Sequence, residues 1–166
     1  MEDFDGYVAV AWQRLLRSAW LLTGDWHRAE DLLQTVLARA YGRWPRLRDD
    51  APDAYLRAML ATTYLTWWRR RWRGEVPTPD LPDTAVLDDH HSVDLRQVFA
   101  GALAELPRKQ RAVLMLRFHA DLTEAETART LGISVGTVKS CTSRALARLR
   151  ADARLRELVF GEGTRA

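Results

Sequence analysis

Residues 122–140 read LTEAETARTLGISVGTVKS, and this stretch decides the fold. Thr123 followed by Glu126 three residues later forms a capping box, a frequent start of a helix. Gly132 can take the left-handed backbone conformation that ends this helix, and Ser134 can cap the next one. Two short helices joined by so tight a turn predict a helix-turn-helix, whose second helix is free to enter a DNA major groove.

The helix after Ser134 has two faces of different character. One face is apolar or small and is expected to pack inward, close to Ile133, and it comprises Val138, Thr142, Ala145 and Leu149. The other face is polar and becomes basic toward its C-terminal end, and it comprises Thr137, Lys139, Ser140, Ser143, Arg144 and Arg148. Such side chains suit phosphates and base edges. An ordinary amphipathic helix with a solvated face is the alternative, but the turn and the basic flanks favour DNA binding.

The rest of the chain carries helical patterns. Apolar residues recur at steps of three and four over residues 29–40, which is typical of an amphipathic helix. Further helices are expected over residues 7–22, 53–73, 94–106, 108–119, 123–131 and 135–150, with a loop at 42–51. No alternating strand pattern competes, so the sequence predicts an all-α fold. We expect Trp12, Trp20 and Trp26 to belong to its core.

An acidic, proline-rich segment separates two basic halves. Residues 75–94 contain three prolines and six acidic residues but no Lys or Arg. Proline removes helix donors and like charges repel, so this segment is expected to be an extended linker. The chain would then consist of two small helical domains, 1–74 and 94–155, joined by the linker 75–93 and followed by a short tail, 156–166. Both halves carry a net positive charge, which suggests two contacts with a polyanion.

Several classes of function are excluded by what the sequence lacks. Cys141 is the single cysteine, and His90 and His91 have no matching ligand pair nearby, so we expect no metal site. No phosphate-binding glycine loop or nucleophile–base signature is present, so the chain is expected to be no enzyme and to need no cofactor. No apolar run reaches the roughly 18 residues of a membrane span, and the N-terminus is acidic rather than basic. We expect a cytoplasmic protein.

Three segments together resemble the extracytoplasmic-function (ECF) sigma factors of bacterial RNA polymerase, the small sigma-70-type proteins common in actinobacteria. Residues 106–140, LPRKQRAVLMLRFHADLTEAETARTLGISVGTVKS, resemble the domain that binds the −35 promoter element. Residues 24–44, GDWHRAEDLLQTVLARAYGRW, resemble the helix that binds core polymerase, and residues 54–73, AYLRAMLATTYLTWWRRRWR, resemble the −10-binding helix. The resemblance implies an alternative sigma factor that directs transcription initiation in a stress or envelope response.

The resemblance also implies roles for particular residues. Docking on the clamp-helix coiled coil of the largest catalytic polymerase subunit is implied for Glu30, Asp31, Leu33, Gln34 and Leu37. Capture of the melted −10 strand is implied for Thr62, Tyr64, Trp67, Trp68, Arg69, Arg70, Arg71 and Arg73, with a flipped base held by the loop 43–50. Aromatic faces stack on unpaired bases and arginines follow the backbone. The residues alone leave open whether Trp67 and Trp68 contact DNA or belong to the core.

The chain departs from the family pattern at three positions. Thr62 stands where the family often has Asn, Thr66 where it often has Asp, and Cys141 where it usually has Arg, which would remove one phosphate contact. The resemblance further implies that the acidic linker threads the RNA-exit region of polymerase, where it could mimic a nucleic acid, although a plain spacer is the alternative. It also allows an anti-sigma factor as a partner.

Two other classes of protein remain as competing interpretations. A response-regulator output domain resembles residues 94–150, but such a regulator would carry an α/β or ligand-binding domain before it. An anti-sigma or other interaction protein would show a metal-binding or membrane segment, and neither is found in the sequence.

Overall fold

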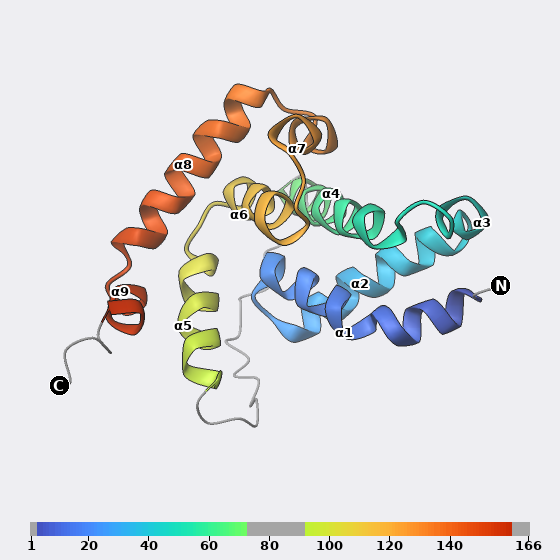
Figure 1. Cartoon of the computed structure of the whole chain (residues 1–166), viewed down its shortest axis with the longest axis horizontal. Coiled ribbons are helices and arrows are strands. Elements are labelled where there is room, and N and C mark those ends of the chain that lie inside the picture. The colour runs from blue at the N-terminus through green and yellow to red at the C-terminus, as the bar shows by residue number, and fades with distance from the viewer. Residues whose placement is uncertain (1–2, 73–91, 161–166) are drawn as a thin grey trace.

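The computed structural model describes residues 3–72 and 92–160, and these residues fold into helices joined by short connections (Figure 1). The helices of the N-terminal half are α1 (Phe4–Thr23), α2 (Trp26–Tyr41), α3 (Trp44–Leu47) and α4 (Pro52–Trp72). Those of the C-terminal half are α5 (Ser92–Ala104), α6 (Arg108–Leu114), its π-helical continuation η1 (Met115–His119), α7 (Glu124–Leu131), α8 (Val135–Ala151) and α9 (Ala153–Phe160). The all-α prediction is confirmed. Most of the expected linker, with His90 and His91, lies outside the described residues.

The N-terminal half is built from α1, α2 and α4, whose apolar faces pack together. Gly24 ends α1 with a positive φ of 69°, and Asp25 caps α2 by accepting a hydrogen bond from the Arg28 amide at 3.1 Å. Large side chains with at most 2% exposure form this core, namely Leu15, Leu22, Leu32, Leu33, Val36, Leu56, Leu60 and Tyr64. The three tryptophans expected in the core, Trp12, Trp20 and Trp26, are half-buried and pack against it.

Hydrogen bonds to Asp53 link the start of α4 to α1. The Asp53 carboxylate accepts hydrogen bonds from Arg14 Nε at 2.5 Å and Arg14 Nη2 at 3.0 Å, and from the Tyr7 hydroxyl. The hydrogen bond from Arg14 holds the pKa of Asp53 below its ordinary value. Burial, reinforced by the neighbouring carboxylate, raises the pKa of the Tyr7 hydroxyl. This network fixes α4 before its exposed C-terminal turns begin.

The expected loop at 42–51 contains a short helix, α3, which the sequence did not predict. Pro45 is tolerated there because the first turn of a helix needs no amide donor. Trp44 anchors α3, since its ring is 8% exposed and lies 5.2 Å from the Phe4 ring and 4.8 Å from the Tyr7 ring. The rest of the segment connects α3 to α4.

The helix-turn-helix is confirmed in detail. Thr123 and Glu126 form the expected reciprocal capping box, and Gly132 takes a left-handed conformation with φ 66°. Ser134 caps α8 by accepting a hydrogen bond from the Thr137 amide at 3.0 Å. The crossing of α6, α7 and α8 is filled by Val113, Ala128, Val138 and Cys141.

The C-terminal boundary differs from the prediction, because α9 extends through part of the expected tail to Phe160. Asp152 starts this helix: its carboxylate accepts hydrogen bonds from the Arg154 amide at 2.9 Å and the Leu155 amide at 3.3 Å. Arg154 Nη2 also pairs with Glu105 Oε1 at 3.1 Å, which ties α9 to α5. A helix cap and one ion pair to a distant helix therefore order this segment.

The two halves are packed against each other, although the sequence suggested separate domains. Figure 1 shows α6 between α8 and the N-terminal helices. Ala112, Met115 and Leu116 are at most 3% exposed and belong to the same buried cluster as α1, α2 and α4.

Candidate DNA and polymerase interfaces

The outer face of α8 is an exposed polar and basic surface. Lys139, Ser140, Ser143, Arg144 and Arg148 are all exposed, while Thr137 is half-buried. The opposite face of the helix is held in the core by Val138 and Ala145, both without solvent exposure. The structure thus brings the six residues predicted for −35 contact onto one side of one helix.

Local hydrogen bonds fix the N-terminal turn of this surface. The Thr137 hydroxyl lies 2.8 Å from the Ser134 hydroxyl, and the Ser140 hydroxyl donates to the Thr137 carbonyl at 3.1 Å. Lys139 Nζ lies 3.9 Å from Glu124 Oε2 of α7, an exposed and therefore weak ion pair. The first turn of α8 is thereby preorganised, and its amino end offers the positive end of the helix dipole to an anion.

Cys141 points away from the proposed DNA face. It is 9% exposed and packs with Val113, Ala128 and Val138. Its departure from the family pattern consequently leaves the outer surface of α8 unchanged. The thiol fills the core rather than facing solvent.

A polar pocket of about 490 Å³ lies between the end of α2 and the middle of α4. Arg43 Nη1 donates to the Tyr55 hydroxyl at 2.9 Å, and Arg39 Nη1 lies 3.5 Å from the Thr63 hydroxyl. The lining residues are Arg39, Arg43, Tyr55, Ala58, Met59, Thr62 and Thr63. The pocket thus combines two cations, an aromatic ring, a thioether and hydroxyl groups, which suits an unpaired base and its phosphate.

The two threonine departures on α4 have a definite geometry. The Thr62 hydroxyl donates to the carbonyls of Ala58 at 3.1 Å and Met59 at 3.2 Å, and the Thr66 hydroxyl donates to the Thr62 carbonyl at 2.8 Å. With its proton directed at the backbone, the Thr62 hydroxyl is left with a lone pair that can accept a hydrogen bond from a ligand in the pocket. An amide at this position could also donate.

The structure separates the other residues predicted for −10 contact. Arg69 and Arg70 are exposed near the end of α4, whereas Tyr64 is 2% exposed and Trp67 is half-buried against the core. The Arg111 guanidinium lies 6.0 Å from the centroid of the buried Tyr64 ring, and a contact of Tyr64 with the −10 strand stays a prediction. The side chains of Trp68 and Arg71, and all of Arg73, lie outside the described residues.

The predicted polymerase-docking residues also fall into two groups. Glu30, Asp31 and Gln34 are exposed along one side of α2. Leu33 has no solvent exposure and Leu37 has 7%, so both belong to the core. These leucines hold α2 in the core of the N-terminal half, and their contact with polymerase stays a prediction.

Sequence reasoning did not identify Arg39, Tyr55 and Met59 as site residues. A signal was present: Tyr55, Met59 and Thr62 recur at helical spacing, and Arg39 and Arg43 are four residues apart. Their convergence depends on how α2 crosses α4, which no local pattern specifies.

Comparison with known proteins fits these surfaces. A family model for sigma-70 region 2 matches residues 9–74, and one for sigma-70, region 4 matches residues 102–151. The chain is 45% identical over 157 residues to the RNA polymerase sigma-E factor of Streptomyces avermitilis, a match that covers 94% of this chain and 88% of the relative. It is 35% identical over 155 residues to the ECF RNA polymerase sigma factor SigL of Mycobacterium tuberculosis, covering 89% and 84%. The chain belongs to the ECF sigma factors. It directs promoter-specific transcription initiation by RNA polymerase and is not an enzyme.

A solved structure shares the fold of this ECF sigma factor. The sigma factor RpoE in complex with the anti-sigma factor NepR from Bartonella quintana matches with a TM-score of 0.64 at 24% identity, covering 99% of this chain and 100% of that chain. Within the described residues, we find no helix with the length and apolar character of a membrane span. The same residues hold no group of three His, Cys, Asp or Glu side chains that could bind a metal ion.

Proposed function

We propose that this ECF sigma factor reads its promoter through two separate surfaces, the outer face of α8 for the −35 duplex and the pocket on α4 for an unpaired −10 base. The observation that carries this proposal is the exposed polar and basic face of α8 on a fully capped helix-turn-helix. Run-off transcription with core polymerase on a promoter library tests it. A library that yields no promoter with distinct −35 and −10 elements would contradict the proposal.

The −35 readout follows from position along α8. In a helix-turn-helix the N-terminal residues of the second helix reach base edges, and more distant basic residues reach phosphates. Ser140 and Arg144 share one exposed face of α8 and precede Arg148, so we assign base contacts to them. Arg148 lies one turn further along, and with Lys139 it is assigned to the phosphate backbone.

The −10 readout follows from the contents of the pocket. A base flipped out of the melted strand would stack against apolar and aromatic walls at Met59 and Tyr55, while Arg39 and Arg43 face the backbone phosphates. The Thr62 hydroxyl can accept a hydrogen bond from an N–H group on the edge of this base. Melting is favoured because an unpaired base fits the pocket and a paired base does not.

The exposed side of α2 is proposed to bind the clamp-helix coiled coil of the largest catalytic polymerase subunit. Asp31→Ala combined with Gln34→Ala should weaken binding in a pull-down with core polymerase and leave the fold intact, since both side chains are exposed. Asp49→Ala with Gln13→Ala is the matched control, because it removes an exposed acid and an exposed glutamine elsewhere. If core polymerase retains both double variants equally in the pull-down, this assignment is wrong.

We also propose that an anti-sigma factor controls this protein and that it acts in the cytoplasm, where core polymerase works. Support comes from the fold shared with a sigma factor solved in complex with an anti-sigma factor. The acidic linker is proposed to occupy the RNA-exit region of polymerase. Replacing the five acidic residues of the linker 75–93 with their amides should alter promoter escape in abortive-transcript assays, and unchanged abortive products would favour a plain spacer.

A further inference from the structure

Tyr7 of α1 contacts the two segments that supply opposite walls of the α2–α4 pocket. Its hydroxyl donates a hydrogen bond to the carboxylate of Asp53, in the first turn of α4. Its ring lies 4.8 Å from the ring of Trp44, at the start of α3, and the two ring planes are inclined by 38°. Tyr7 and Trp44 are both buried. One side chain of α1 therefore joins the start of α3 to the start of α4, and Figure 1 shows α3 beside this end of α4.

The position of Arg43 depends on that of Trp44, because the two residues are adjacent and belong to the same short turn. The Arg43 amide donates to the Ala40 carbonyl of α2 at 2.9 Å, and the Arg43 carbonyl accepts from the Leu47 amide of α3 at 3.2 Å. From this fixed backbone the side chain reaches across the pocket, where Nη1 donates to the Tyr55 hydroxyl at 2.9 Å. A shift of Trp44 would therefore move the guanidinium that forms one wall of the pocket.

The position of Tyr55 depends in the same way on that of Asp53, because both residues lie in the first turns of α4. Each residue rotates an α-helix by about 100°, so residues two apart point to nearly opposite sides. Asp53 is accordingly bonded to Arg14 and Tyr7 of α1, while Tyr55 lines the pocket. Any rotation of the helix start that breaks the bonds of Asp53 would also move the Tyr55 ring.

The turn between α3 and α4 is strained. Ala51 has a φ of 45°, in the left-handed region that residues with a Cβ rarely adopt. Its carbonyl accepts hydrogen bonds from the amides of Ala54 at 3.2 Å and Tyr55 at 3.5 Å, so this residue forms the start of α4. Strained backbone persists only where surrounding contacts determine it, and it clusters at functional sites. The contacts of Tyr7 on either side of the turn supply that constraint.

We propose that Tyr7 is a positioning residue for −10 recognition, a role that rests on the proposed function of the pocket. Tyr7 sets the spacing of Arg43 and Tyr55 but is itself buried and does not touch DNA. Recognition of an unpaired base depends on the geometry of stacking and of hydrogen bonds to the base edge. Loss of the Tyr7 hydroxyl therefore reduces discrimination among bases, an effect distinct from a loss of stability.

Tyr7→Phe tests this role, because it keeps the ring beside Trp44 and removes the hydrogen bond to Asp53. Tyr41→Phe is the matched control, since it removes an exposed tyrosine hydroxyl at the end of α2. Each full-length variant is assembled with core polymerase and transcribes a promoter library randomised in both the −35 and the −10 element. Tyr7→Phe should lower the preference for the best base at one −10 position by about threefold to tenfold and leave the −35 preference unchanged. The control should keep both preferences.

Tyr55→Phe applies the same measurement to the pocket itself, because it removes the acceptor for Arg43. If Tyr7 acts through this pair, the two substitutions are not additive, and the double variant should discriminate no worse than Tyr55→Phe alone. Additive losses would overturn the positioning role, as would a −10 preference that Tyr55→Phe loses and Tyr7→Phe keeps. A −10 preference unchanged in Tyr55→Phe would contradict the proposed pocket, and the role of Tyr7 with it.

Ala51→Gly separates positioning from stability and decides the matter if Tyr7→Phe folds poorly. Glycine adopts a positive φ without strain, so this variant should melt no lower than the parent in thermal unfolding. The turn also becomes freer, so the −10 preference should fall by about threefold while the −35 preference is retained. An Ala51→Gly variant with parental stability and parental −10 preference would overturn the inference, because the geometry of this turn would then not affect base recognition.

Discussion

Two arginines on α8 are expected to play different roles in DNA binding, because they lie at different positions along the helix. Arg144 and Arg148 are both exposed and lie one helical turn apart on the same helix. Arg144 shares its face with Ser140 and lies near the middle of α8, whereas Arg148 is displaced toward the C-terminal end by about 6 Å along the axis. A bidentate contact with guanine specifies a base, but a phosphate contact only adds affinity.

Arg144→Ala is therefore expected to flatten sequence preference at one −35 position, with a loss of about 1–3 kcal/mol of discrimination. Arg148→Ala should weaken binding to all sequences alike and lower the salt slope by about one unit. Both variants are measured against single-base −35 variants at two salt concentrations. If Arg144→Ala lowers affinity uniformly and keeps the parental preference, Arg144 is a backbone contact.

Asp53 offers a stability prediction with a defined pH dependence. Its native pKa lies below the ordinary value because Arg14 donates to it, so its contribution is present above the unfolded-state pKa and is lost as pH falls through the native pKa. Asp53→Asn should destabilise the chain at neutral pH by about 1–3 kcal/mol in urea unfolding. The difference between the variant and the parent should shrink below about pH 4, where the parental carboxylate becomes protonated. A difference that is constant from pH 7 to pH 3 would show that Asp53 acts through shape and not charge.

At the scale of the elements, helix ends were predictable and helix contacts were not. The hydrogen bonds that start and end these helices join groups only three or four residues apart, so they can be predicted directly from the sequence. They involve Thr123, Glu126, Gly132 and Ser134. The α2–α4 pocket instead requires the hydrogen bond between Arg43 and Tyr55 across the helix crossing.

The contact between Arg111 and α1 could not be predicted from the sequence either. Arg111 reads as an ordinary basic residue in a basic half, because its partner carbonyl at Leu22 is 89 residues away and belongs to the backbone. Likewise, Leu33 and Leu37 matched a polymerase-binding segment of the family, although their spacing serves the core. Resemblance to a family therefore predicts the role of a whole helix better than the role of each side chain on that helix.

The cap of α8 gives a prediction at this scale. Ser134→Ala removes the acceptor for the Thr137 amide and should cost about 1 kcal/mol of stability. Because Thr137 also loses its hydroxyl contact with Ser134, −35 affinity should fall further than thermal stability alone explains. Ser134→Asp restores a cap but adds a negative charge at the DNA end of α8. The Ser134→Asp variant should therefore recover stability in thermal unfolding and still bind −35 DNA poorly. Full recovery of −35 binding would mean that the cap acts only on folding.

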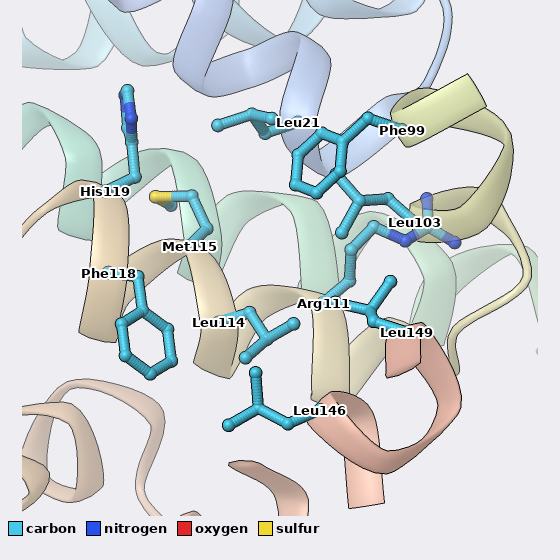
Figure 2. A pocket seen from close by; sticks show the side chains of 10 residues that line it. All are labelled: Leu21, Phe99, Leu103, Arg111, Leu114, Met115, Phe118, His119, Leu146 and Leu149. Atoms are coloured by element: carbon cyan, nitrogen blue, oxygen red, sulfur yellow. The ribbon is translucent and has the colours of Figure 1, made fainter. Parts of the chain in front are cut away.

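At the scale of the whole molecule, the two halves meet where α6 and η1 pack against α1 and α4, and an apolar pocket of about 370 Å³ lies beside this packing. Leu21 lies where the α1 surface meets the apolar cavity, and it is half-buried (Figure 2). Side chains of both halves line this pocket, so it exists only while the halves are packed together. Changes in the volume of the Leu21 side chain should therefore change the stability of this packing in a direction set by their sign.

Leu21→Phe adds apolar volume that the pocket can accept, so it should stabilise the packing of the two halves, whereas Leu21→Ala removes apolar contacts and should weaken this packing. Removing buried methyl groups costs about 2–5 kcal/mol in a full core, and a half-buried leucine should give about 1 kcal/mol. In urea unfolding, Leu21→Phe should raise the midpoint and Leu21→Ala should lower it. Both should leave −35 duplex binding by the free chain unchanged, because the exposed residues of α8 do not line the pocket. Equal shifts in the same direction from both substitutions would mean that Leu21 acts through the packing of region 2 alone, and not through the pocket between the halves.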